Sequence, residues 1–308
     1  MGARLRGPAP VCHDDAVREA TVLLDDGRRL SYADRGSEDG FPLMYFHGVP
    51  GGRSLGFDPD AVAATGTRVI TVERPGFGRS DPCPGRTLSD WPRDVEALAG
   101  HLGIDRFAVA GASAGAPGAL ACAYWMADRV TSAGIICGVG PLYDHPEFDD
   151  LLAPEFKALL PLIRQNRGAA LEAVEAFIAP AAASWAADPS AFWDAWVAGL
   201  PESVQRQMVL PGVREMWEGC FASTYERGAA AVVDEVGANY SSWGFSVRDV
   251  EVPVHVWHGA DDNAGSAPVE VARFVAGEAR QGELVVYPGE GHFLDRRHHL
   301  DWLTALAR

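Results

Sequence analysis

The feature that most constrains the fold of this chain is a serine between two glycines, in the sequence Gly-Ala-Ser-Ala-Gly at residues 111–115. An apolar run at residues 107–110 precedes it and an alanine-rich stretch follows at 116–121, which predicts a strand, a sharp turn and a helix. A serine in so tight a turn leaves no room for side chains two positions away, so glycines there let the strand and the helix pass closely. We therefore expect Ser113 to stand at the carboxyl end of a sheet strand.

The same five-residue pattern occurs a second time, at residues 52–56, with Ser54 at its centre. No apolar strand leads directly into Ser54, and Pro59 interrupts any helix soon after it. We interpret Ser54 as a loop or helix-start serine and Ser113 as the candidate nucleophile.

Length and charge limit the class of protein. The 308 residues fit one large α/β domain, or one core that carries an insertion. A net charge of −16 argues against nucleic acid and anionic membrane surfaces as partners. The chain has no apolar run that could span a bilayer and no apolar signal segment near its start, so we expect a cytoplasmic protein. Five cysteines without a Cys-x-x-Cys pair indicate reduced thiols rather than a disulfide or zinc framework.

Strand-like and helix-like segments alternate along most of the chain. Residues 20–24 and 29–34 flank an Asp-Asp-Gly turn, which predicts an antiparallel hairpin. The alternation beyond it predicts an α/β fold with a mostly parallel sheet and helices on both faces. Further strands are expected at 42–46, 68–72, 130–137, 252–257 and 283–287, besides the run before Ser113, and helices at 91–102, 267–276 and 295–307.

Residues 140–246 break this alternation. The segment is helical in pattern throughout, with stretches at 154–163, 169–178, 190–200 and 212–224 and no convincing strand. An insertion of this size should sit as a cap over the carboxyl edge of the sheet. The predicted organisation is a loose N-terminal arm at 1–18, a core at 19–139 and 247–308, and a helical cap insertion at 140–246.

Two later loops carry an acid and a histidine. The strand that ends at residue 257 leads into a loop with Asp262, and the strand that ends at residue 287 leads into a loop with His292. Asp261 competes for the position of the acid, but the spacing from Gly259 favours Asp262. Serine, acid and histidine therefore occur in chain order, each just beyond the carboxyl end of a predicted strand.

Five short motifs together resemble the α/β-hydrolase fold family. They are a His-Gly-x-Pro-Gly loop at Gly48, an Arg-Pro-Gly-x-Gly-x-Ser loop at Gly76, the serine elbow at Ser113, a Gly-x-x-Asp loop at Asp262 and a Gly-His pair at His292. The chain is similar in particular to the capped bacterial serine hydrolases, which include esterases and lactonases. The resemblance covers about residues 20–308 apart from the cap.

The resemblance implies a catalytic role for each of these residues. Ser113 would be the nucleophile, His292 its general base, and Asp262 the carboxylate that orients the imidazole. The backbone N–H groups of Val49 and Ala114 would form the oxyanion hole. No cofactor and no metal are implied.

We therefore expect a cofactor-independent serine hydrolase that cleaves a small apolar ester, thioester or lactone. Two alternatives stay open: a C–C bond hydrolase or acyl-transferring or cyclising enzyme of secondary metabolism with the same triad, and a weakly catalytic ligand-binding protein. Monomer and homodimer are both compatible with the sequence.

The remaining histidines are interpreted as structural. His47 would shape its loop and His258 would lie in a turn. His298 and His299 are adjacent, so they point in different directions, and no carboxylate or cysteine cluster joins them; we interpret them as surface residues rather than as metal ligands.

Overall fold

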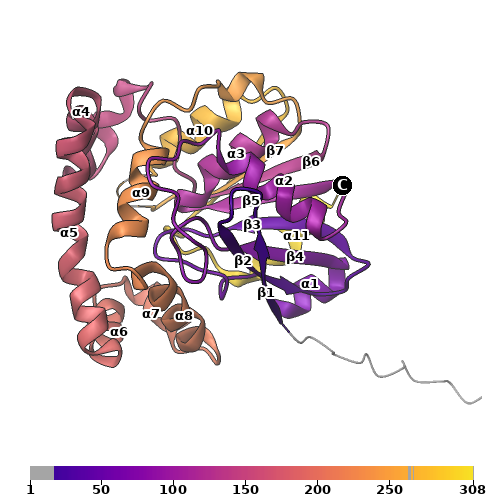
Figure 1. Cartoon of the computed structure of the whole chain (residues 1–308), viewed down its shortest axis with the longest axis horizontal. Helices are drawn as coiled ribbons and strands as arrows, with labels where there is room; N and C mark the ends of the chain where they lie inside the picture. Colours follow the sequence, from indigo (N-terminus) through magenta and orange to yellow (C-terminus); the bar gives the residue numbers. More distant parts are fainter. Residues whose placement is uncertain (1–16, 263–264, 266, 308) are drawn as a thin grey trace, which may run out of the picture.

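The computed structural model describes residues 17–262, 265 and 267–307, and within them one eight-stranded sheet forms the centre of the molecule (Figure 1). The strand order is β1-β2-β4-β3-β5-β6-β7-β8. The strands are β1 (Arg18–Leu23), β2 (Arg29–Arg35), β3 (Phe41–Phe46), β4 (Thr67–Val72), β5 (Phe107–Ala112), β6 (Val130–Ile136), β7 (Val254–Gly259) and β8 (Gly282–Tyr287).

Most of the strand pairs are parallel, as the alternating sequence pattern predicts. β1 and β2 form the expected antiparallel hairpin, and Gly27 in its turn has a φ of +85° that glycine adopts without strain. β2 also pairs antiparallel with β4, whereas the pairs from β4 through β8 run parallel. The carboxyl ends of β3 and β5 to β8 therefore meet at one edge of the sheet.

The side chains of successive strand residues enter two different cores. On β3, Leu43 packs on one face of the sheet and Met44 on the other, because side chains alternate along a strand. Helices α1 (Pro59–Thr65) and α11 (His299–Leu306) cover the face of Leu43. Helices α2 (Trp91–His101), α3 (Ala116–Trp125) and α10 (Val269–Glu278) cover the opposite face.

Helix α1 was not predicted, because Pro59 is interpreted from the sequence as a residue that interrupts a helix. Pro59 is instead the first helical residue, where a missing N–H costs nothing. The carboxylate of Asp58 caps this helix by accepting a hydrogen bond from the N–H of Asp60. Helix α2 begins at Trp91, where the sequence predicts a helix. Val95 and Leu98 lie on its buried face.

Residues 140–246, all of which the structure describes, contain helices and no strand. The α-helices are α4 (Pro154–Gln165), α5 (Arg167–Ala187), α6 (Pro189–Ala198), α7 (Glu202–Met208), α8 (Val213–Tyr225) and α9 (Ala230–Asn239). In Figure 1, α4, α5 and α6 form an outer row, with α7, α8 and α9 between that row and the strands. Helices α7 and α9 lie between the stretches named from the sequence, in a segment predicted to be helical throughout, and α5 runs nine residues beyond the stretch that ends at 178.

The ends of the prediction differ slightly from the structure. β1 starts at Arg18, one residue before the predicted start of the core. Residues 1–16 of the predicted arm lie outside the described residues. The four cysteines in the described part of the chain are free thiols. Among the helices that the structure describes, none is long and apolar enough to cross a membrane.

His299, which was interpreted as a surface residue, is partly buried where α11 begins. Its Nδ1 accepts a hydrogen bond of 2.9 Å from the backbone N–H of Asp58, and its ring packs edge-on against Phe57. Burial lowers the pKa of His299 to about 4, and the nearby Arg296 acts in the same direction. The folded protein therefore holds this imidazole neutral well below its ordinary pKa of 6.5.

We expect His299→Gln to flatten the pH dependence of stability between about pH 6.5 and pH 4. In that window the unfolded chain binds a proton at His299 that the folded protein does not, so the free energy of unfolding falls as the pH is lowered, by up to about 3 kcal/mol. Urea unfolding at a series of pH values measures this slope. His101→Gln removes an exposed histidine and serves as the control; equal slopes for the two variants would contradict the prediction.

Candidate active site

Ser113 stands at the turn between β5 and α3. It begins a short 3-10 turn, η1 (Ser113–Gly115), with a φ of +51°, a left-handed conformation that non-glycine residues rarely adopt. Its carbonyl oxygen accepts a hydrogen bond of 3.1 Å from the N–H of Val139. The strained backbone is thus fixed from outside the turn.

The two glycines that flank Ser113 are required by close backbone contacts. A Cβ on Gly111 would overlap the carbonyl group of Gly115, and a Cβ on Gly115 would overlap the carbonyl oxygen of Phe46 at the end of β3. Glycine at both positions therefore lets the strand and the helix pass closely, as the sequence predicts. Gly48 passes beside the serine as well, because a Cβ there would lie 3.1 Å from Ser113 Cβ.

Asp262 and His292 come together from the loops that follow β7 and β8. His292 Nδ1 and Asp262 Oδ2 are 2.8 Å apart, and the Asp262 side chain is fully buried. Asp261 is exposed, and its N–H donates to the carbonyl of Glu290 in the histidine loop. Of the two candidate acids, Asp262 is therefore the one that contacts the histidine.

His258 also lies beside Asp262. It is buried at the end of β7 rather than in a turn, and its Nε2 is 2.9 Å from the carbonyl oxygen of Ala267 and 3.3 Å from Asp262 Oδ2. Burial lowers the pKa of His258 and keeps the ring neutral. With its proton on Nε2, His258 links Ala267 to the end of β7.

A cysteine completes a cluster of three possible metal ligands. Ligand atoms of Cys137, Asp262 and His292 lie within 4.8 Å of one another. Burial and the neighbouring Asp262 carboxylate raise the pKa of the Cys137 thiol well above its ordinary value. Asp262 and His292 are paired with each other in this cluster, and we assign no metal to it.

Ser113 and His292 line the same cavity, which has a volume of about 460 Å³. Apolar side chains of α8 and of the histidine loop, among them Trp217 and Phe293, form part of its wall. Ser54 lines it too, but this serine lies in a turn and its Oγ contacts Cys220 Sγ at 3.4 Å.

A second cavity, of about 420 Å³, meets the first at the serine. Ser113 and Val49 line both cavities, and Ala114 lines the second. Its other walls are mostly apolar side chains of α4, α5 and α9: Phe156, Leu159, Leu162, Val174, Phe177, Ile178, Val232 and Val236. Both residues expected to supply the oxyanion hole therefore line the second cavity, and Val49 lines the first as well.

The loop that carries Val49 is anchored to α8. The N–H of Gly51 donates to Thr224 Oγ1 at 2.9 Å, and Thr224 Oγ1 bonds the carbonyl of Cys220 one turn earlier in the helix. A Cβ on Gly52 would overlap Ser223. The backbone of this loop therefore packs directly against the small side chains of Ser223 and Thr224.

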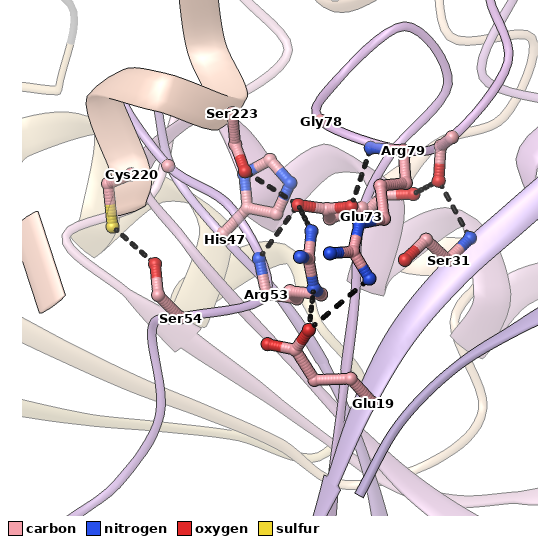
Figure 2. Close-up of polar contacts among 12 residues, drawn as sticks. Glu19, Ser31, His47, Arg53, Ser54, Glu73, Gly78, Arg79, Cys220 and Ser223 are labelled. Carbon is pink, nitrogen blue, oxygen red and sulfur yellow. Dashed lines mark hydrogen bonds and ion pairs between the residues drawn. The ribbon is translucent and has the colours of Figure 1, made fainter. Parts of the chain in front are cut away.

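Figure 2 shows a second anchor of the same loop, the fully buried carboxylate of Glu73. Glu73 accepts hydrogen bonds from Arg53 at 2.8 Å, from Ser223 Oγ at 2.6 Å and from the N–H of Arg79 at 3.0 Å. Glu19 on β1 forms ion pairs with both Arg53 and Arg79. One carboxylate thus joins the loop of Val49, the loop after β4 and helix α8.

Three buried residues around the serine turn were not identified from the sequence. Arg74, Glu235 and Asn239 form a hydrogen-bonded chain that reaches the carbonyl oxygen of Ala114. Arg74 belongs to the Arg-Pro-Gly loop, which was recognised by its glycines without a role for the arginine. Glu235 and Asn239 lie on α9 and stand in a helical stretch without a distinguishing pattern, so no signal in the sequence marks them.

The chain is similar to known proteins in sequence and in fold. A family model described as the alpha/beta hydrolase family matches residues 43–308. A proline iminopeptidase of Xylella fastidiosa is 35% identical over 118 residues, which cover 36% of each chain, so the match spans about a third of that relative's length.

Solved structures resemble the chain over almost its whole length. A hydrolase from Pseudomonas aeruginosa superposes with a TM-score of 0.65 at 16% identity, over 95% of this chain and 96% of the other. A thermophilic esterase from Thermogutta terrifontis superposes with a TM-score of 0.61 at 22% identity, over 94% of this chain and 100% of the other. At these identities the likeness establishes the fold.

We expect Gly115→Ala to lower the free energy of unfolding by about 1–3 kcal/mol, because the new Cβ would overlap the backbone of Phe46. Gly100→Ala is the matched control. Gly100 is an exposed residue of α2 with open space at its Cβ position, so alanine there should stabilise the helix by about 0.5–1 kcal/mol. Urea unfolding measures both changes, and a Gly115→Ala variant as stable as the parent would refute the packing argument.

Proposed function

The chain belongs to the α/β hydrolase family, and on that premise we propose that it is a cofactor-independent serine hydrolase acting on an apolar carboxylic ester, thioester or lactone. One observation carries the proposal: His292 contacts the buried carboxylate of Asp262 and lines the same cavity as Ser113. These three residues come from three separate loops at one edge of the sheet.

The proposed chemistry follows from the orientation of the imidazole. With Nδ1–H donating to Asp262, the Nε2 atom of His292 is left as a base that takes the Ser113 hydroxyl proton during attack on the carbonyl. The acyl group is then held on Ser113, and His292 returns the proton to the leaving alcohol or thiol. Asp262 stabilises the imidazolium that forms between these steps.

The oxyanion is assigned to two backbone donors, the N–H groups of Val49 and Ala114. Both residues line the second cavity beside Ser113. Loss of one such donor costs about 3–4 kcal/mol of transition-state stabilisation in enzymes of this type. The anchors described for the Val49 loop support this role, because a donor must be held in place before charge develops.

The two cavities support a substrate with an apolar group on each side of the scissile bond. We propose that residues 140–246 act as the cap that forms both binding sites. Helices α7 and α8 contribute walls to the first cavity and α4, α5 and α9 to the second. Solvent exclusion by the cap would strengthen the electrostatic interactions at the reacting centre.

The similarity to proline iminopeptidases favours a second candidate, hydrolysis of a peptide bond next to a free N-terminal proline. The cationic amine of such a substrate needs a carboxylate that is not already neutralised. Of the two carboxylates at the second cavity, Glu235 is paired with Arg74 and Arg86, whereas Glu155 is exposed. Glu155 is therefore the residue on which this candidate depends.

We expect a fluorophosphonate probe to label the protein at Ser113. Ser113→Ala should lose the label and lose about 10⁴-fold or more in kcat on activated esters, because the proposed acyl-enzyme forms on the Ser113 hydroxyl. Ser54→Ala, which removes the serine of the other Gly-x-Ser-x-Gly pattern, should keep the label. Equal labelling of the parent and Ser113→Ala would contradict the proposal, and labelling without turnover of any ester would favour a ligand-binding protein.

A substrate panel tests how the cavities are used. Leu159→Trp should fill part of the second cavity and lower kcat/KM for long substrates about 10-fold relative to an acetate ester. The panel varies the acyl and the alcohol chain separately and includes lactones, thioesters and a proline anilide. Leu151→Trp, at an exposed position, is the control. Equal losses on every ester would mean that the second cavity does not bind substrate, and cleavage of the anilide alone would favour the peptidase.

A further inference from the structure

We propose that Arg74 positions the oxyanion hole and that Glu235 of α9 holds Arg74 in that place, so that the cap segment supports transition-state stabilisation directly. The inference rests on the proposed function, because it needs Val49 and Ala114 as the donors. It concerns residues that do not touch the substrate's reacting atoms, so Arg74 and Glu235 are positioning residues.

Arg74 donates to one carbonyl group beside each of the expected oxyanion donors. One guanidinium nitrogen, Nη2, donates to the carbonyl oxygen of Gly48 at 3.0 Å, and the other, Nη1, donates to that of Ala114 at 2.9 Å. The carbonyl of Gly48 and the N–H of Val49 belong to the same planar peptide unit, so fixing one fixes the direction of the other. A charged donor on the carbonyl also polarises that N–H.

His47 supports the same peptide unit. Its Nε2 accepts a hydrogen bond of 3.3 Å from the backbone N–H of Arg74, which places the ring proton on Nδ1, and Nδ1 lies 2.8 Å from the carbonyl oxygen of Gly48. Burial, with the Arg74 charge beside it, lowers the pKa of His47 well below its ordinary value. A neutral imidazole and a guanidinium thus converge on one carbonyl.

Ala114 is held on both sides of its α-carbon. The peptide unit that carries its N–H has the Ser113 carbonyl at the other end, which accepts from Val139. The carbonyl of Ala114 accepts from Arg74 and, at 2.8 Å, from Asn239 Nδ2 on α9. Arg74 therefore contacts the backbone beside both expected donors, the N–H groups of Val49 and Ala114.

Glu235 fixes the guanidinium of Arg74 from the cap segment. One carboxylate oxygen of Glu235 pairs with Arg74 and the other with Arg86, while Asn239 donates to the first at 2.8 Å. The side chains of Arg74 and Glu235 are each 3% exposed. Burial lowers the pKa of Arg74 to about 10, and the Glu235 carboxylate opposes that shift and favours the charged form.

A purely structural ion pair would stabilise the fold without affecting the reaction, so the test must separate the two roles. Arg74→Lys keeps a positive charge beside Glu235, but a single ammonium cannot reproduce the planar fork that reaches both carbonyls. We expect kcat on the best ester to fall roughly 10- to 100-fold with KM nearly unchanged. Affinity for a trifluoromethyl ketone, which forms an oxyanion on Ser113, should fall in parallel, whereas affinity for the matching non-reactive amide should not change.

Arg164→Lys is the matched control. Arg164 also bonds two backbone carbonyls, those of Leu142 and Tyr143, together with the carboxylate of Asp149, and it is not among the residues that line the two cavities. Its replacement should alter stability without changing kcat or ketone affinity. If Arg74→Lys fails to fold, Asn239→Ser removes one uncharged donor to the Ala114 carbonyl and should produce the same selective loss, smaller in size.

The outcomes separate the inference from the proposed function. A parent protein that neither reacts with fluorophosphonate nor cleaves any ester would overturn the proposed function and this inference with it. An active, labelled parent whose Arg74→Lys variant keeps its kcat and its ketone affinity would overturn the inference alone. Equal loss of affinity for the ketone and the amide would do the same, because it would reveal a general distortion of the site.

Discussion

The close approach of Gly115 to the carbonyl oxygen of Phe46 is the constraint on which the rest of the site depends. It brings the turn after β5 against the end of β3, where a side chain on Gly115 would separate the two. The loop that leaves β3 must then pass beside Ser113, since Gly48 is already in contact with it. Backbone N–H groups can act on a group bound at Ser113 only if the backbone itself comes this close, because they have no side-chain length with which to reach it.

Two buried carboxylates connect that arrangement to the helices of residues 140–246. Glu73 binds α8 through Ser223, and Glu235 projects from α9 toward Arg74 and Arg86. Removing charged groups from water is expensive, and it is compensated only where several donors surround each carboxylate. We infer that these two networks specify the position of the helices more than they add to stability, since apolar packing would serve stability as well.

The strands and the site loops could be predicted from the sequence because their signals are local. Apolar runs ending in glycine-rich loops mark the strands, and Ser113, Asp262 and His292 each follow such a run; their catalytic roles stay predictions. The insertion of β4 between β2 and β3 leaves no local trace, because strand order depends on contacts between distant segments.

Features that depend on tertiary contacts could not be predicted in the same way. Helix α1 was missed because the pattern around Pro59 describes a helix start as well as a break. His299 looked like a surface residue because its partner, the N–H of Asp58, lies 241 positions away. Glu235 and Asn239 were missed for the same reason: their importance comes from partners in loops of the core.

Ser113 lines both cavities, and this bears on the step that would follow release of the first product. Under the proposed function, an acyl group on Ser113 would occupy one cavity, and departure of the alcohol would empty the other. A nucleophile would then reach the ester through the emptied cavity. Water has little affinity for an apolar chamber, whereas a second alcohol of similar shape is retained there. Under the proposed function, the two cavities would therefore influence how the acyl group is partitioned between hydrolysis and transfer to another alcohol.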